Sequence, residues 1–139
     1  TPRGVDLLNG GAARYRTYPT ADGKAIALGA VEPKFWLAFC TAAGRDDWVS
    51  RINEPLPQND LQAEVATLIA SMTLEECNAK FGVIDCCYSE VLPLSEAVNT
   101  PHIQARKLVV KSESGEYQAL YPAYVDGEAP DVRKEFEEQ

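Results

Sequence analysis

The hydrophobic pattern changes from that of a strand to that of a helix within Lys24-Ala25-Ile26-Ala27-Leu28-Gly29-Ala30-Val31-Glu32-Pro33-Lys34-Phe35-Trp36. Residues 24–30 predict a strand. Pro33 suits the first turn of a helix and pushes Glu32 into an extended conformation, so the strand ends and the helix begins at Glu32. The apolar face that follows at helical spacing stops at Gly44 and consists of Phe35, Trp36, Phe39, Cys40 and Ala43.

Working outward, a second strand is predicted just before this segment, over residues 14–18. The two strands are separated by Thr20-Ala21-Asp22-Gly23, whose Asp-Gly pair favours a hairpin turn because glycine tolerates a positive φ. The N-terminal residues, with the pair Gly10-Gly11, indicate an extended or looped lead into this hairpin.

The middle of the chain predicts helices. After a linker rich in Pro and Asn at residues 53–59, the pairs Asn59/Gln62 and Thr73/Glu76 have the spacing of capping boxes. A short strand is expected within residues 83–92, and short helical pieces at 95–98 and 101–106, the latter capped by Thr100. A second hairpin joins 108–111 to 117–121. The predicted class is therefore α+β, with two separated β-hairpins around a helical middle.

Charge and hydropathy limit the function classes. Thirteen Lys and Arg against 21 Asp and Glu leave a net charge of −8, which argues against a nucleic-acid partner. No apolar run approaches the roughly 20 residues that span a bilayer, and no secretory leader is recognised, so we expect a soluble chain without a membrane partner. Residues 52–100 hold one basic and eight acidic residues, whereas residues 1–51 hold seven and five, so an anionic ligand would meet the least repulsion in the first third.

The four cysteines, Cys40, Cys77, Cys86 and Cys87, form no C-x-x-C pair, and with a single His they offer no metal site. They could form two disulfides in a secreted protein. Without a leader, we expect buried and reduced thiols and a cytoplasmic location.

Glu32 is the residue that stands out chemically. A carboxylate between a strand end and a helix start lies where ligand sites often form, and the helix dipole favours its ionised form. The alternative is a simple helix-cap carboxylate. His102 is expected to be a surface helix residue, the aromatic stripe from Phe35 to Phe39 to be core, and Tyr117, Tyr121 and Tyr124 to be packing residues rather than a stacking platform.

Several motifs in this order resemble one family, the family III CoA-transferases (the CaiB/BaiF superfamily), and within it the α-methylacyl-CoA racemases. They are Arg3-Gly4, Leu7-Leu8-Asn9-Gly10-Gly11-Ala12, Tyr15 to Tyr18, Thr20 to Gly23, Leu28 to Trp36, Asp85 to Ala97 and Thr100 to Arg106.

The resemblance implies that the chain is the small α+β domain of a protein more than twice as long. Residues 1–12 would be a linker, 13–124 the domain, and 125–139 an acidic tail or linker toward a large domain. Family members form interlocked homodimers. They act on coenzyme A thioesters without a covalently bound cofactor, and use catalytic groups of the large domain, a His and an Asp in the racemases. The chain alone is then expected to be catalytically silent.

The implied function is racemisation of 2-methylacyl-CoA thioesters by exchange of the α-proton. The alternatives are CoA transfer between carboxylic acids, disfavoured by the reduction of the transferases' glycine-rich loop to Gly10-Gly11, and a free-standing, non-catalytic binding module. By position, the resemblance assigns Glu32 to orienting the catalytic His. It assigns Leu8, Gly10, Gly11, Tyr15 and Val31 to the surroundings of the acyl group. It does not identify the acyl substrate.

Overall fold

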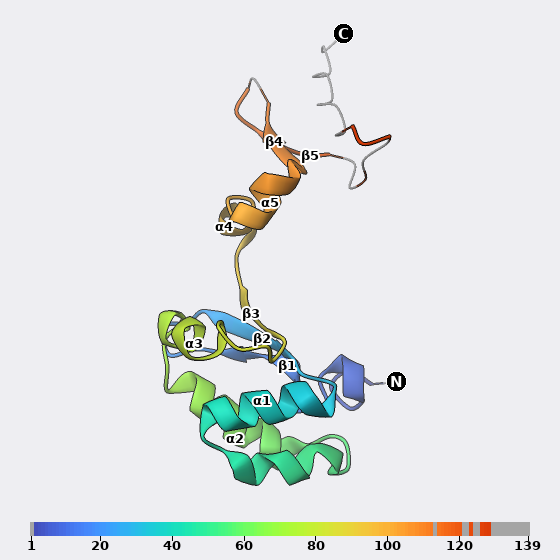
Figure 1. The fold of residues 1–139 in the computed structure, drawn as a ribbon, viewed down its shortest axis with the longest axis vertical. Coiled ribbons are helices and arrows are strands. Elements are labelled where there is room, and N and C mark those ends of the chain that lie inside the picture. The colour runs from blue at the N-terminus through green and yellow to red at the C-terminus, as the bar shows by residue number, and fades with distance from the viewer. Residues whose placement is uncertain (1, 113, 121–122, 124–125, 129–139) are drawn as a thin grey trace. The chain divides into compact units, whose positions relative to one another are not determined.

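A computed structural model of the chain describes residues 2–112, 114–120, 123 and 126–128. The chain divides at residue 91 into two units, residues 1–91 and 92–139. Each unit contains one small antiparallel sheet, which confirms the predicted α+β class (Figure 1).

The sheet of the first unit has three strands in the order β1-β2-β3. The predicted hairpin is present as β1 (Tyr15–Pro19) and β2 (Ala25–Gly29), with Tyr15 opposite Gly29. The short strand expected within residues 83–92 is β3 (Tyr88–Val91), and it pairs antiparallel with β2 so that Leu28 lies opposite Tyr88. The first hairpin is therefore extended by a strand that comes from far along the chain.

Helices cover one face of this sheet (Figure 1). In chain order the helical elements are the 3-10 turn η1 (Leu7–Asn9), α1 (Pro33–Ala43), the 3-10 helix η2 (Asp46–Asn53), α2 (Asn59–Ala70) and α3 (Leu74–Phe81). The boundaries of α1 are as predicted, since Glu32 is its extended N-cap, Pro33 its first residue and Gly44 its left-handed C-cap with φ 70°.

The two predicted capping boxes differ in outcome. At α3 the box is confirmed, because the Glu76 amide donates to Thr73 Oγ1 at 3.3 Å and the Thr73 amide donates to Glu76 Oε2 at 2.7 Å. The box at Asn59 is wrong. The N-cap of α2 is Gln58, and the Gln62 side chain bonds to the carbonyls of Gly10 and Gly11 instead. The side chain that the local pattern assigned to the helix cap makes tertiary hydrogen bonds instead.

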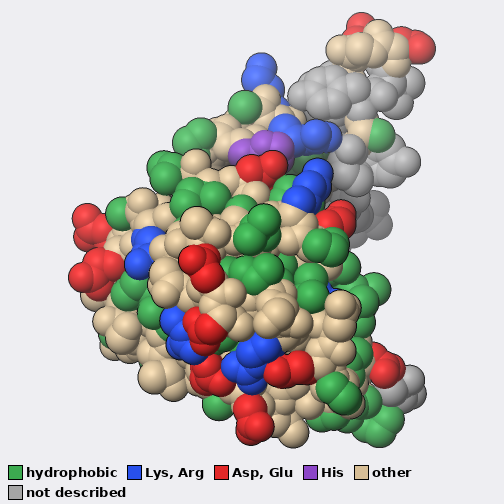
Figure 2. Space-filling view, turned by 60° about the horizontal axis from the view of Figure 1, so that its bottom comes forward, with side chains coloured by type: hydrophobic (Ala, Val, Ile, Leu, Met, Phe, Trp, Pro, Cys, Tyr) green, Lys and Arg blue, Asp and Glu red, His purple; other side chains and the backbone are tan. Residues whose placement is uncertain are grey.

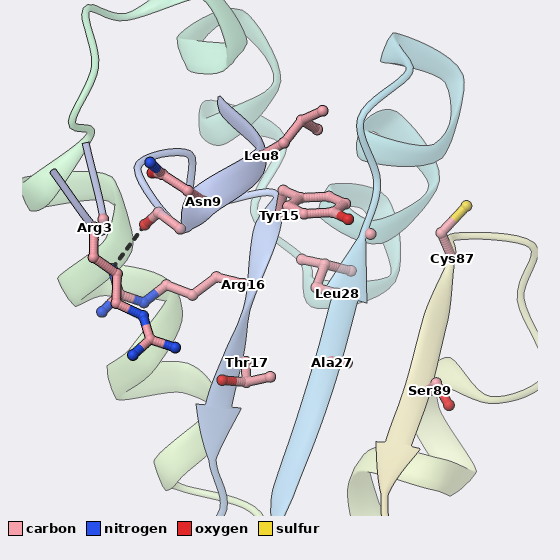
Figure 3. A pocket seen from close by; sticks show the side chains of 13 residues that line it. Arg3, Leu8, Asn9, Tyr15, Arg16, Thr17, Ala27, Leu28, Cys87 and Ser89 are labelled. Carbon is pink, nitrogen blue, oxygen red and sulfur yellow. Dashed lines mark hydrogen bonds between the residues drawn. The ribbon is translucent and has the colours of Figure 1, made fainter. Parts of the chain in front are cut away.

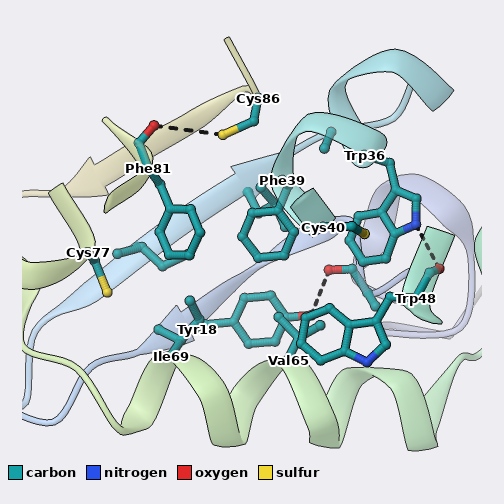
Figure 4. Packing of buried hydrophobic residues seen from close by; sticks show 14 of the residues in the cluster. Tyr18, Trp36, Phe39, Cys40, Trp48, Val65, Ile69, Cys77, Phe81 and Cys86 are labelled. Atoms are coloured by element: carbon teal, nitrogen blue, oxygen red, sulfur yellow. Dashed lines mark hydrogen bonds between the residues drawn. The ribbon is translucent and has the colours of Figure 1, made fainter. Parts of the chain in front are cut away.

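Aromatic rings fill the space between sheet and helices (Figure 4). Trp36 stacks on Phe39 with ring centroids 5.6 Å apart and on Trp48 at 6.4 Å, and Phe39 meets Phe81 at 5.0 Å. The Trp36 indole donates to the Trp48 carbonyl at 3.1 Å, so the buried indole N–H has a hydrogen-bond partner. The prediction that the aromatic stripe of α1 is core is confirmed for Trp36 and Phe39, which are fully buried.

All four cysteines are free, and three of them, Cys40, Cys77 and Cys86, are buried. Burial raises the pKa of Cys40 to about 12, which keeps this thiol protonated. The expectation of burial is wrong for Cys87, which is exposed and adopts a left-handed conformation with φ 55°. Cys87 directly precedes β3, and its left-handed backbone is not that of a strand residue.

The second unit contains α4 (Leu94–Ala97), α5 (Pro101–Arg106) and the predicted hairpin, β4 (Val109–Lys111) with β5 (Tyr117–Ala119). Thr100 is the N-cap of α5, but its hydroxyl donates to the Ala97 carbonyl rather than capping the helix. His102 lies exposed on α5, as expected. Tyr121, Tyr124 and most of the acidic tail lie outside the described residues.

Acidic and basic side chains are mixed on the face shown in Figure 2, and one cluster of them links η2 to α2. Glu64 of α2 accepts hydrogen bonds from Arg45 at 2.6 Å, from Arg51 at 2.6 Å and from the Trp48 indole at 2.9 Å. These donors, led by Arg51, lower the pKa of Glu64 to about 2. The carboxylate thus fixes the 3-10 helix that inserts Trp48 into the core.

We predict that Glu64→Gln lowers the free energy of unfolding by about 1 kcal/mol at neutral pH, the size of a partly screened ion-pair network. Because folding depresses the pKa of Glu64, its stabilisation is complete above the usual pKa of 4.5 and is lost as the pH falls toward 2. Urea unfolding of both proteins from pH 7 to pH 2 checks this. The difference between them should vanish at the acid end, and a difference that is constant over this range would contradict it.

Candidate functional site

A cavity of about 960 Å³ lies over the face of the first sheet opposite the helices. Its floor comes from all three strands, and its wall from the N-terminal loop around η1 (Figure 3). The lining residues are Arg3, Gly4, Leu8, Asn9, Gly10, Tyr15, Arg16, Thr17, Ala27, Leu28, Gly29, Cys87 and Ser89.

The period-two alternation of the strands creates this floor. On one face of β2, Ile26 and Leu28 are buried against the helices. On the other face, Ala27 and Gly29 carry little or no side chain, so the sheet surface is low there. Thr17 on β1 and Ser89 on β3 flank them with short polar groups. The result is a shallow, mostly apolar trough with room for a ligand chain.

The wall of the cavity depends on the two glycines. Gly10 has φ 98°, a conformation that disfavours side chains, and Gly11 passes so close to the preceding turn that a Cβ would lie 2.5 Å from the Val5 carbonyl carbon. Their carbonyls accept hydrogen bonds from Gln62 Nε2 at 3.2 and 2.6 Å. The glycine pair is thus needed to form and anchor the loop, whatever it binds.

The residues that the sequence analysis assigned to acyl binding fall in two groups. Leu8, Gly10 and Tyr15 line the cavity, and the Leu8 side chain is 63% exposed there. Gly11 is buried beneath the loop, and Val31 is half-buried after β2 with its carbonyl accepting from Arg14 Nε at 3.3 Å. Neither of these two is among the lining residues.

The rest of the lining was not predicted from the sequence, most notably Arg3, Arg16 and Cys87. The alternation of β1 and β2 could have indicated Thr17 and Ala27. For Cys87 and Ser89 the pairing of β3 with β2 had to be known first.

Glu32 lies at the N-terminus of α1, and its side chain is exposed. It makes no side-chain capping hydrogen bond, and among the described residues no hydrogen bond or ion pair to its carboxylate is found. Partial desolvation raises the pKa of the Cys87 thiol, and the negative charges of Glu32 and Asp85 raise it further. The charge of Glu32 therefore acts on a residue that lines the cavity. Glu32 is not among the lining residues, and its carboxylate is free to accept a hydrogen bond from another group.

Two further observations limit the chemistry of the described residues. They contain no cluster of three or more His, Cys, Asp or Glu side chains able to hold a metal ion. None of their helices is long and apolar enough to span a bilayer.

We predict that iodoacetamide alkylates Cys87 and leaves the three buried cysteines unmodified in the folded chain. Since the thiolate is the reactive form and the pKa of Cys87 is raised above its usual 9.0, the rate should keep rising above pH 9. Intact mass and peptide mapping check the site, with Cys87→Ser as the unreactive control. Equal modification of Cys86 would contradict the placement of these two thiols.

The chain is similar in sequence to proteins of one family. The family model for CoA-transferase family III matches residues 2–135. The α-methylacyl-CoA racemase of Mus musculus is 33% identical over 112 residues, covering 76% of this chain and 28% of the relative. The α-methylacyl-CoA racemase of Homo sapiens is 32% identical over 123 residues, covering 81% and 30%. The chain thus spans less than a third of the length of these curated relatives.

Among solved structures, a D175A mutant of Rv3272 from Mycobacterium tuberculosis has a TM-score of 0.69 at 23% identity, over 87% of this chain and 36% of that one. This likeness concerns the fold. Because the family model extends over nearly all residues, the chain belongs to CoA-transferase family III.

Proposed function

We propose that the cavity holds the acyl part of a CoA thioester, and that the whole protein racemises 2-methylacyl-CoA thioesters by exchanging the α-proton. The observation that carries this proposal is the apolar trough between Leu8, Tyr15 and the small residues of β2, with Cys87 at one side. Glu32 is not among the lining residues, but its negative charge acts on the Cys87 thiol. The similarity to two α-methylacyl-CoA racemases supports the choice of reaction.

Removal of a thioester α-proton needs a positioned base and a site that stabilises the enolate. In this proposal the proton is moved by a His and an Asp of a large domain outside these 139 residues, as the family resemblance implies. His102 is not assigned to this role, because it belongs to a different motif and lies in the second unit. The chain alone is then silent, and the active species is an interlocked homodimer.

In this proposal the trough binds the acyl chain and excludes water, and it does not supply the catalytic base. Ala27 and Gly29 leave space for an alkyl chain, while Tyr15 and Leu8 offer apolar walls that are exposed without a ligand, at 38% and 63%. A bound acyl chain would cover these side chains and remove water from the reacting carbon, which strengthens the electrostatic interactions there.

Glu32 is assigned the role of a positioning residue. A carboxylate that accepts a hydrogen bond from an imidazole fixes its tautomer and favours the protonated form, as the Asp does in a catalytic triad. Its carboxylate at the N-terminus of α1 makes no capping hydrogen bond and is available for that bond. The capping alternative lacks its expected hydrogen bond, because no cap is made by the side chain.

The cytoplasmic location stays a prediction. It is supported by four unpaired cysteines, three of them in a core that does not need cross-links.

We expect the native protein that contains this chain to replace the α-proton of (2S)-2-methyldecanoyl-CoA by deuterium in D₂O, measured by mass spectrometry, while the acyl group stays on CoA. Glu32→Gln should lower kcat by roughly 10²-fold, the lower end of what a positioned general base contributes, with little change in KM. The acid limb of the pH–rate profile should also move to lower pH, because the His loses the carboxylate that favours its protonation.

Glu75→Gln, which removes an exposed carboxylate from the first turn of α3, is the matched control and should leave kcat unchanged. Transfer of CoA to an added carboxylic acid without isotope exchange would replace racemisation by the transferase alternative. An unchanged kcat and pH profile in Glu32→Gln would return this residue to a helix-end role.

A further inference from the structure

We infer that Arg3 and Arg16 form a subsite for an oxyanion at the end of the cavity away from Cys87, and that a carboxylate or phosphate of the acyl-CoA ligand occupies it. The identity of the ligand rests on the proposed function. The existence of the oxyanion subsite rests on two arginines that both line the cavity, Arg3 from the N-terminal loop and Arg16 from β1 (Figure 3).

Arg3 and Arg16 are two cations that line the same cavity in a chain rich in acidic residues. The chain has 21 acidic side chains for 13 basic ones, so a cation has many potential partners. Arg45 and Arg51 do pair with carboxylates, at 2.6 to 2.7 Å. In the described part of the chain, neither Arg3 nor Arg16 forms an ion pair with a carboxylate. Two guanidinium groups that line one cavity without a counter-charge favour an anion that comes from outside.

Arg16 is held in position by neutral acceptors. It donates to the Gly10 carbonyl at 3.1 Å and to Gln62 Oε1, and these bonds attach it to the loop and to α2. A guanidinium has five donors, so these two bonds leave others for a ligand. Because both partners are uncharged, the positive charge of Arg16 is not neutralised.

Arg3 is carried by a closed loop rather than by a free end. The Gly4 amide donates to the Asn9 carbonyl at 3.1 Å, and Asn9 Nδ2 donates to the Pro2 carbonyl at 3.0 Å. The backbone on both sides of Arg3 is thereby tied to η1, while its guanidinium makes no hydrogen bond within the described residues. The loop therefore presents a fixed Cα and an unoccupied planar donor group, which suits bidentate binding of a carboxylate or phosphate.

The polarity of the cavity indicates how the ligand would lie. Ala27 and Gly29 form a low apolar floor, with Cys87 at one side and the arginines at the other. A ligand with an apolar stretch and one anionic group fits this order. An acyl chain that ends in a carboxylate and the phosphates of CoA itself both meet this description, and the experiment separates them.

The first measurement uses pyrophosphate as the probe, at low ionic strength, with the arginine Nε–Hε signals of the 139-residue chain observed by NMR. We expect the signals of Arg3 and Arg16 to shift and saturate, while those of Arg45 and Arg51 stay in place. Arg3→Gln should weaken pyrophosphate binding at least about tenfold, since a hydrogen-bonded charge pair is lost. Lys24→Gln, which removes the same charge outside the cavity, is the control. Unshifted Arg3 and Arg16 signals, or equal affinity in Arg3→Gln and Lys24→Gln, would overturn the subsite.

The second measurement compares octanoyl-CoA, its ω-carboxylated counterpart octanedioyl-CoA and CoA alone by calorimetry, on the unaltered chain and on Arg3→Gln. A loss of about tenfold confined to octanedioyl-CoA assigns the subsite to the acyl carboxylate. A similar loss for all three ligands assigns it to the CoA phosphates. Equal affinities of the two proteins for every ligand would overturn the inference and leave the proposed function standing.

If pyrophosphate saturates the arginines but neither thioester binds more tightly than CoA, the oxyanion subsite stands and acyl binding in the trough fails. Arg3→Gln removes no hydrogen bond of the described structure, so a folding defect does not confuse the result. Arg16→Gln serves as the second variant, with its circular dichroism compared to the unaltered chain because Arg16 also anchors the loop.

Discussion

Two glutamine side chains at the start of α2 connect the helical layer to the loop that precedes the sheet. The Gln58 side chain is buried, with 3% exposed. It accepts a hydrogen bond from the Ala13 amide at 3.1 Å and donates to carbonyls at the end of η2. The backbone amide of Gln58 donates to the Gly11 carbonyl at 2.9 Å. Gln62 completes the link through Gly10 and Gly11. A buried amide left unpaired would cost about 1–3 kcal/mol, so the loop, α2 and η2 are stabilised in one arrangement.

The fixed position of this loop determines the shape of the cavity. The loop held by the glutamines leads into β1, where Tyr18 points into the core with its hydroxyl on the Ala13 carbonyl at 2.6 Å and Tyr15 and Thr17 point the other way. The helices cover one face of the sheet, and the loop covers only an edge of the other. What remains is a trough whose floor is low because of Ala27 and Gly29. Arg3 lies on its wall, and Arg16 of β1 reaches toward that wall by donating to the Gly10 carbonyl. The open face and the buried face of the sheet thus both follow from the same alternation.

Features that depend on neighbouring residues could be predicted from the sequence. The Asp-Gly turn, the change at Glu32-Pro33, the stop at Gly44 and the cap at Thr73 each need only a few adjacent residues, and each is present. The resemblance to a family added Leu8 and Tyr15, which do line the cavity. Pairing of β3 with β2, the use of Gln62 by the loop and the exposed turn at Cys87 depend on contacts between distant segments, and local pattern carries no information on them.

We propose that the open face of the first sheet, and not the helical face, receives the acyl-CoA. A titration of the ¹⁵N-labelled chain with 2-methyldecanoyl-CoA, followed by the backbone amide signals, tests this most directly. The account predicts saturable shifts at Thr17, Ala27 and Ser89, whose side of the sheet lines the cavity, with α1 and α2 unaffected. Shifts confined to α1 and α2, or no saturable shift on the open face, would contradict it.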